Sequence, residues 1–286
     1  MKKALSLMTA AALVLSLAAC GSTASSAASS EAASPEAASS DAASSEAASS
    51  EAASETETAE LSTVEPGKLI MSTNAAFPPY EMTTDSGEFE GIDIETAQAI
   101  ADKLGLELQI DDMDFDAALL SVQQGKADIV MAGVTVTDER KAVMDFSDSY
   151  ATGIQSIIVP EGSDIASPDD LAGKKIGTQR GTTGYIYCSD AFGDDSVVAY
   201  DDGLTAVQAQ HNGQVDCVVI DNAPAKEFIA ANPGLKLLDT AYVEESYAIG
   251  VGKGNTELKD AINTALEELK ADGTLQAIVD KYITAE

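Results

Sequence analysis

A repeated helix–strand unit limits what this chain can fold into more than any other feature of its sequence. Residues 118–133 ("ALLSVQQGKADIVMAG") align without gaps on residues 206–221 ("AVQAQHNGQVDCVVID"). In both copies, apolar residues at helical spacing stop at a glycine, and an aspartate three residues later opens a buried strand (Asp128 and Asp216). Two units built on one plan predict two α/β lobes with related structures.

Strand and helix patterns alternate through the rest of the chain between residues 68 and 221. Short apolar strands are followed by segments with apolar residues at helical spacing, and the pattern restarts after "SPDDLAGKK". Such alternation predicts parallel βαβ units, with an open α/β sheet in each lobe. The expected strands are 68–73, 106–110, 127–133, 175–179 and 215–221, and the expected helices are 92–105, 114–125 and 204–213.

The last part of the chain, residues 255–283, predicts two helices that are separated at Gly273. Since the repeat leaves no sheet for them in the second lobe, we expect them to return to the first lobe. The chain would then cross between the lobes twice, near residues 150–155 and 243–249. The predicted lobes are residues 63–151 with 250–286, and residues 152–249.

Residues 1–19 are predicted to be a lipoprotein signal peptide and not part of the fold. Two lysines precede an apolar segment that is shorter than the roughly 20 residues needed to span a bilayer. The residues "LAAC" that follow resemble the lipobox of bacterial lipoproteins, in which cleavage occurs before a cysteine, here Cys20, that becomes acylated. Lipid on Cys20 would anchor the protein to the cell membrane on its extracytoplasmic side. Ordinary secretion with Cys20 unmodified is the alternative.

Residues 20–62 consist mainly of alanine, serine and glutamate. Acidic residues recur every five positions, a step that leaves no apolar face on a helix. With few large side chains to bury, this segment is expected to be a disordered tether between the membrane and the folded part. A partly helical alanine-rich stalk is the alternative and would have the same role.

The charge and the cysteines of the chain restrict its partners. The chain has 48 Asp and Glu residues against 16 Lys and Arg residues, so nucleic acid is a poor partner for the folded part. No spacing of His, Cys and carboxylate residues is typical of a metal site, and we predict neither a metal nor a cofactor. A disulfide between Cys188 and Cys217 stays open, but Cys217 lies in an apolar strand and is interpreted as a small buried residue.

Only two of the basic residues are arginines, Arg140 and Arg180, and both follow strands beside glycine and threonine residues. Ligands of open α/β sheets bind beyond the carboxyl ends of the strands. Both arginines are therefore expected at a cleft between the lobes. The other residues expected at these strand ends are Asn74, Ala132, Gly133 and Thr135 in the first lobe, and Gln179, Thr182, Thr183 and Asp221 in the second.

Five motifs occur in order along the chain: "TNAAFPPYE", "GIDIETAQAIADKLG", "GKADIVMAGVTVTDERKAVMDFSDSY", "KKIGTQRGTTG" and the looser "VVIDNAPA". From Lys68 to Ile283 the sequence resembles family 3 of the bacterial solute-binding proteins, the amino-acid receptors of ABC importers. The resemblance implies a periplasmic-binding-protein-like fold, in which two α/β lobes are joined by two hinge strands. It also implies a monomeric receptor that closes over one free amino acid and delivers it to an ABC permease.

The resemblance assigns roles to the charged residues of the cleft. Arg140 would hold the α-carboxylate of the ligand by a bidentate pair, and Asp221 would pair with the α-ammonium. Thr135 and backbone N–H groups near Gly133 would donate to the carboxylate, or Thr135 would accept from the ammonium. These roles agree with the chemistry of a zwitterion, which needs one fixed cation and one fixed anion when it is buried.

The resemblance also assigns roles to uncharged residues. Thr182 and Thr183 would donate hydrogen bonds from the second lobe. Phe77 and Phe115 would pack on the ligand side chain, or they are ordinary core residues.

The charged residues have plain structural alternatives. Arg140 could pair with Asp138 or Asp145 at the start of a helix, and Asp221 could simply cap the helix that follows it. Arg180 could contact the ligand, face solvent or pair with an acid.

Asn74 and Gln179 are uncharged and are expected to lie opposite each other across the cleft. They favour a ligand with a neutral polar side chain, such as glutamine or cystine, while a basic amino acid stays open. Rival functions are a dehydratase-like enzyme on the same fold and a stand-alone surface sensor. The predicted cleft contains no Ser-His-Asp set and no Cys-His pair, which argues against an enzyme. A sensor would usually be fused to a transmembrane helix and a signalling domain.

Overall fold

The computed structural model describes residues 61–283. The predicted signal peptide, the lipidation site at Cys20 and nearly all of the predicted tether lie outside the described residues. Leu61 packs against the apolar core, and the carbonyl oxygen of Ser62 accepts a hydrogen bond from Asn255 Nδ2 at 2.9 Å. The folded part therefore includes the last two residues that the sequence assigns to the tether.

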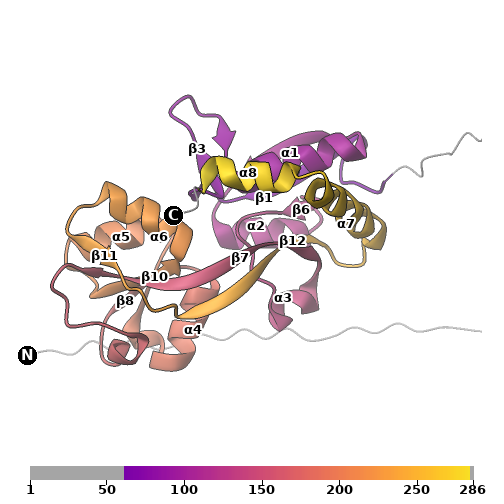
Figure 1. The fold of residues 1–286 in the computed structure, drawn as a ribbon. Helices are drawn as coiled ribbons and strands as arrows, with labels where there is room; N and C mark the ends of the chain where they lie inside the picture. Colours follow the sequence, from indigo (N-terminus) through magenta and orange to yellow (C-terminus); the bar gives the residue numbers. More distant parts are fainter. Residues whose placement is uncertain (1–60, 284–286) are drawn as a thin grey trace, which may run out of the picture. The chain divides into compact units, whose positions relative to one another are not determined.

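Two long strands connect the lobes (Figure 1). β7 (Met144–Pro160) and β12 (Val243–Gly252) pair in antiparallel register, and the pairing shifts in register on both sides of Ala248. β12 also pairs with a strand of the first lobe, and β7 with strands of the second. The prediction of two α/β lobes joined by two hinge strands is confirmed.

Each lobe has the open α/β sheet that was predicted, and the hinge strands join the two into one continuous sheet. The main strands form one sheet in the order β5-β1-β6-β12-β7-β10-β8-β9, with β11 beside β7. The reason is the length of β7, which has 17 residues and keeps a paired edge in both lobes. The first lobe contributes β1 (Lys68–Thr73), β5 (Glu107–Asp112) and β6 (Ile129–Val130), and the second contributes β8 (Ile176–Gln179), β9 (Val197–Tyr200), β10 (Cys217–Asp221) and β11 (Leu235–Leu237). A small second sheet contains β2 (Ala76–Phe77), β3 (Glu81–Thr83) and β4 (Phe89–Glu90).

Helices cover the sheet in both lobes (Figure 1). The last two, α7 (Thr256–Ala271) and α8 (Thr274–Tyr282), pack on α1 of the first lobe. Lys103 Nζ of α1 pairs with Glu268 Oε2 at 3.0 Å, and the Tyr282 hydroxyl donates to Glu95. The other helices are α1 (Ile92–Leu104), α2 (Phe115–Gln123) and α3 (Asp138–Val143) in the first lobe and α4 (Thr183–Phe192), α5 (Gly203–His211) and α6 (Asn222–Ala231) in the second, with short 3-10 turns at Pro168–Leu171 and Asp194–Ser196.

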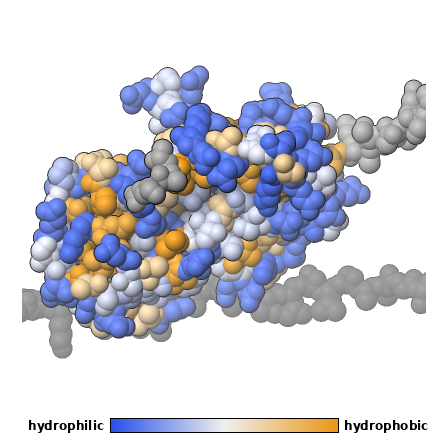
Figure 2. Space-filling model, viewed as in Figure 1, coloured by the Kyte–Doolittle hydropathy of each residue, from blue (hydrophilic) through white to orange (hydrophobic). Residues whose placement is uncertain are grey.

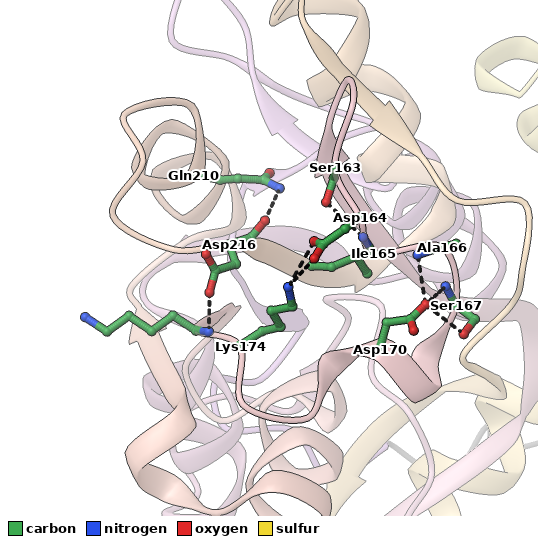
Figure 3. Close-up of polar contacts among 10 residues, drawn as sticks. Ser163, Asp164, Ile165, Ala166, Ser167, Asp170, Lys174, Gln210 and Asp216 are labelled. Carbon is green, nitrogen blue, oxygen red and sulfur yellow. Dashed lines mark hydrogen bonds and ion pairs between the residues drawn. The ribbon is translucent and has the colours of Figure 1, made fainter.

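The two copies of the repeat use their aspartates in the same way. Asp128 Oδ2 accepts from the N–H of Ile70 at 2.8 Å, which ties the start of β6 to β1. Asp216 Oδ2 accepts from the N–H of Lys175 at 2.7 Å, which ties the start of β10 to the start of β8. Asp216 is labelled in Figure 3, which draws its hydrogen bonds as dashed lines. In both lobes a carboxylate therefore continues the strand pairing by one more hydrogen bond.

Neither cysteine in the described residues forms a disulfide. Cys188 and Cys217 are buried as free thiols among the apolar residues of the second lobe. Burial raises the pKa of each thiol to about 12. Cys217 is the small buried residue that its apolar strand predicts.

Hydrophilic residues cover most of the first lobe on the face that Figure 2 shows, while apolar residues are more frequent over the second lobe. Within residues 61–283, none of the helices combines the length and the apolar character needed to cross a membrane.

Candidate functional site

The residues predicted at the strand ends, except Arg180, meet at one cavity. This cavity lies between the two lobes beside the hinge strands. Its predicted lining residues are Asn74, Phe77, Phe115, Ala132, Gly133, Thr135, Arg140, Gln179, Thr182, Thr183 and Asp221. The sequence did not point to four further lining residues, Glu81, Gln155, Val219 and Ile220.

Arg140 lies in the first turn of α3 with its side chain buried. The hydroxyl of Thr137 accepts from the N–H of Arg140 at 3.2 Å and so caps this helix. The guanidinium donates to the carbonyl oxygens of Thr135 at 2.8 Å and Gly181 at 3.1 Å, and it lies 5.4 Å from the centre of the Phe115 ring. A guanidinium has five N–H donors, so donors remain for a bidentate bond to a carboxylate.

The two acids that could have paired with Arg140 have other partners. Asp145 lies 2.8 Å from Lys253 Nζ, and Asp138 lies 3.7 Å from Lys141 Nζ. The alternative in which either acid neutralises Arg140 is therefore wrong.

Asp221 ends β10 with a buried carboxylate. Its side chain makes no cap hydrogen bond to α6, so the alternative of a simple helix cap is wrong. Asp221 Oδ2 accepts from Gln155 Nε2 at 2.6 Å, while Oδ1, near the hydroxyl of Tyr247, has no hydrogen-bond partner of normal geometry among the described residues. Burial raises the pKa of Asp221 to about 7, and the charge of Glu245 adds to the shift. This carboxylate would be stabilised by a cation beside it.

Side chains of the two lobes contact each other directly at the cavity. Gln179 Nε2 of the second lobe donates to Asn74 Oδ1 of the first at 2.8 Å, and Asn74 Nδ2 donates to the carbonyl oxygen of Met113 at 3.0 Å. The bond from Arg140 to Gly181 also joins the lobes. The structure is therefore a closed arrangement in which both amides are engaged.

The family is decided by a match to known proteins. The family model for bacterial extracellular solute-binding proteins, family 3, matches residues 69–285. The chain belongs to this family.

Several members of the family are similar to this chain along most of their length. The L-cystine-binding protein TcyJ of Escherichia coli (strain K12) is 33% identical over 226 residues, which cover 78% of this chain and 85% of that protein. The arginine-binding extracellular protein ArtP of Bacillus subtilis (strain 168) is 31% identical over 223 residues, which cover 77% of this chain and 87% of that protein. Among solved structures, an ancestral arginine-binding protein bound to glutamine is 42% identical with a TM-score of 0.74, and the match covers 77% of this chain and all of that one.

Backbone N–H groups near Gly133 were predicted to donate to the ligand, but in this solute-binding protein the N–H of Gly133 itself is bonded within the protein. Its N–H donates to Asp93 Oδ2 at 3.0 Å, and the hydroxyl of Tyr150 donates to Asp93 Oδ1 at 2.7 Å. Burial raises the pKa of Asp93 to about 6. Gly133 has a φ of 55°, and a Cβ there would lie 2.8 Å from a carbon of the Phe77 ring, so this position needs glycine.

The hydroxyl of Thr182 also differs from its predicted role. It donates to the carbonyl oxygen of Gln179 at 2.8 Å and accepts from the N–H of Tyr185 at 3.3 Å, which caps α4. The first N–H groups of a helix have no partners within the helix, and they favour an anion. The start of α4, at Thr183, can thus offer backbone donors to a carboxylate.

A carboxylate that the sequence did not reveal joins the other two threonines. Thr135 Oγ1 of the first lobe and Thr183 Oγ1 of the second donate to Glu245 Oε2 at 3.1 Å and 3.0 Å. Glu245 lies on β12 with 6% of its surface exposed. Because it follows Glu244 in "VEESY", no local pattern separates it from an exposed acid.

Glu81 and Gln155 were also missed. Glu81 is fully buried, and neither of its carboxyl oxygens has a hydrogen-bond partner of normal geometry among the described residues. Burial and the nearby charge of Asp93 raise the pKa of Glu81 well above its usual value. Gln155 interrupts the apolar part of β7, and this polar residue in an apolar segment is the sequence feature that could have indicated a place at the cavity.

Phe77 and Phe115 lie in the cavity wall and in the apolar core at the same time. Phe77 stacks on Tyr80 with 5.8 Å between the ring centres, whereas Phe115 belongs to a different apolar cluster around α2. Each ring can therefore be a core residue and also lie where a ligand side chain would pack.

Arg180 lies outside the lining of the cavity. Its side chain is 54% exposed, and its Nη2 lies 3.4 Å from Asp201 Oδ1. Of the alternatives that the sequence leaves open, the structure shows pairing with an acid at the surface.

Proposed function

We propose that this protein is an extracytoplasmic receptor that binds one free amino acid in the cavity and delivers it to an ABC permease. One observation carries the proposal: a buried cation, Arg140, and a buried anion, Asp221, come from different lobes and line the same cavity. A zwitterion that pairs with both would link the lobes in the closed arrangement. The assigned role is binding and not catalysis, in agreement with the binding proteins that the chain resembles.

The buried acceptors of the site favour a ligand with a basic side chain, in place of the neutral side chain that Asn74 and Gln179 suggested. Oxygens of Glu81, Gln155 and Asp221 have no hydrogen-bond partner of normal geometry among the described residues, against a single guanidinium. The amides of Asn74 and Gln179 are bonded to each other. Buried acceptors without donors cost free energy, which a cationic ligand would recover.

We propose arginine as the first candidate, since a Streptococcus pneumoniae binding protein that is 36% identical was solved with L-arginine, at a TM-score of 0.71 over 76% of this chain and 94% of that one. Glutamine is the second candidate, because it occupies the ancestral arginine-binding protein. A thermal-shift screen of the twenty amino acids on the mature chain tests this order. Arginine at 100 times its Kd should add about 2.7 kcal/mol to the free energy of unfolding. No shift with any amino acid would contradict the receptor function.

We also propose that the protein is a monomer that lipid on Cys20 anchors to the membrane. "LAAC" and the preceding apolar segment support the anchor. Replacement of Cys20 by serine should move the protein from the membrane fraction to the soluble fraction of lysed cells. A variant that stays in the membrane fraction would contradict lipid attachment at this residue.

A further inference from the structure

One carboxylate lies behind the cavity wall and accepts hydrogen bonds from three groups of that wall. Glu245 Oε2 accepts from Thr135 Oγ1 at 3.1 Å, from Thr183 Oγ1 at 3.0 Å and from Gln155 Nε2 at 3.0 Å. The three donors line the cavity, whereas Glu245 does not. Glu245 therefore acts on a ligand through these neighbours and through its charge, which also acts on Asp221 and Arg140.

These bonds fix the direction of the hydrogen bonds that the wall can make. A threonine hydroxyl has one proton, and both Thr135 and Thr183 give theirs to Glu245. Gln155 Nε2 uses its two protons on Glu245 and Asp221, the latter at 2.6 Å. What these side chains can still offer to a ligand is oxygen lone pairs, so this part of the wall accepts hydrogen bonds and does not donate them.

The reverse direction would be costly. If the threonines donated to a ligand carboxylate, Glu245 would lose the hydrogen bonds of both hydroxyls while 6% exposed. A buried carboxylate without donors is strongly destabilised. The α-carboxylate of a ligand therefore depends on Arg140 and the backbone at the start of α4, and the threonines are left for the α-ammonium.

We propose that Glu245 is the positioning residue that makes the site select ligands with an α-ammonium group, because it holds the hydroxyl protons of Thr135 and Thr183 away from the cavity. The two threonines come from different lobes, so both reach Glu245 only in the closed arrangement. The inference rests on the proposed amino-acid-binding function. It links recognition of the ammonium to closure through one hinge-strand side chain.

The test compares two ligands on the full mature chain. Calorimetry measures the Kd of arginine and of 5-guanidinopentanoate, which is arginine without the α-ammonium. In Glu245→Gln the amide N–H can donate to one threonine, whose proton then turns toward the cavity. We expect arginine to bind about tenfold more weakly or worse, and 5-guanidinopentanoate to bind within about threefold of its wild-type Kd.

Glu244→Gln is the matched control, since Glu244 is the exposed neighbour on the same strand; it should leave both dissociation constants unchanged. Equal weakening of the two ligands by Glu245→Gln would show a merely structural role and overturn the inference, and so would no change in either. If Glu245→Gln does not fold, Thr135→Val replaces it, with the same expected loss for arginine alone.

The wild-type chain separates this inference from the proposed ligand. Failure of the wild type to bind arginine would overturn arginine as the ligand. Glutamine and its des-amino analogue glutaramate then serve as the pair, with the same expected change in the ratio of their dissociation constants. An unchanged ratio in that pair would overturn the role of Glu245 while leaving amino-acid binding intact.

Discussion

The two lobes share a repeated scaffold but place different groups at the ends of its strands. The first copy of the repeat ends at Gly133, which lets the Phe77 ring approach, and the chain then supplies the buried Arg140. The second copy ends at the aligned position Asp221 with a buried carboxylate. The aspartates that start the strands make equivalent bonds in both copies. Complementary halves of a site can thus arise on one scaffold by differences confined to the strand ends.

The lobes also carry one arginine each, and only one arginine lines the cavity. Arg140 is 8% exposed and bonds across the lobes, while the Arg180 side chain is 54% exposed beside Asp201. A position just after a strand was common to both. What differs is whether the side chain turns into the space between the lobes.

The largest effect on ligand binding is expected from removing the Arg140 side chain. Charge-assisted hydrogen bonds contribute roughly 1.5–3 kcal/mol each, so Arg140→Ala should weaken arginine binding by about 3 kcal/mol, on the order of 100-fold. Lysine should restore only part of the affinity, because an ammonium cannot form the planar bidentate pair. Calorimetry on variants with wild-type melting temperatures checks this. Binding within threefold of the wild type would show that the carboxylate is held elsewhere.

A smaller effect is expected from Asp221→Asn, which removes the negative charge that the second lobe places at the cavity. The ammonium would lose its counter-charge but keep the acceptors around it, so arginine affinity should fall by about 2 kcal/mol, roughly 30-fold. Unchanged affinity in calorimetry at pH 8 would remove Asp221 from the site.

Asp221→Asn should also change how the stability of the protein and its affinity for arginine depend on pH. The pKa of Asp221 rises from 3.8 to about 7 on folding, so the folded, ligand-free protein binds more protons than the unfolded chain between these values. The contribution of Asp221 to the free energy of unfolding therefore falls as the pH rises from about 4 to 7, while arginine affinity rises toward pH 7 and above. Asp221→Asn should flatten both curves. Urea unfolding measures the free energy of unfolding between pH 5 and 8, and calorimetry measures the arginine affinity over the same range. If the wild type and Asp221→Asn depend on pH in the same way in both measurements, the assignment is wrong.

The smallest effect is expected from Arg180→Ala. Exposed ion pairs contribute about 0–1 kcal/mol, so arginine affinity should change by less than about threefold. The variant is also the natural control for Arg140→Ala, because it removes the same group from the other lobe. A large loss here would mean that the second lobe holds the carboxylate, and the roles of the two arginines would be exchanged.

Local sequence predicted the elements that position the site because periodicity and breakers act over a few residues. α1 ends at Gly105 with a φ of 68°, as the pattern indicated. Of the strand expected at 127–133, only Ile129–Val130 has regular strand structure, because the chain then turns to bring the N–H of Gly133 to Asp93.

The partners of the buried acids could not be predicted in the same way. Glu245 meets Thr135 across 110 residues and Thr183 across 62, and these contacts exist only once both hinge strands are in place. Glu81 lies inside a motif that supports the family resemblance, yet its burial depends on packing against α1 and the cavity wall. Strand ends could be located from sequence, whereas the direction of each hydrogen bond between them required the folded structure.

Because the sheet is continuous, the hinge between the two lobes consists of paired strands. β7 and β12 stay bonded to each other and to strands of both lobes, so opening bends a ribbon and leaves its ladder intact. The irregular pairing beside Ala248 is a place where such a ribbon yields easily. Opening would break the polar contacts across the lobes from Arg140 to Gly181 and from Gln179 to Asn74. A small molecule that bonds to both lobes shifts the balance between the two shapes by the difference in its affinity for them.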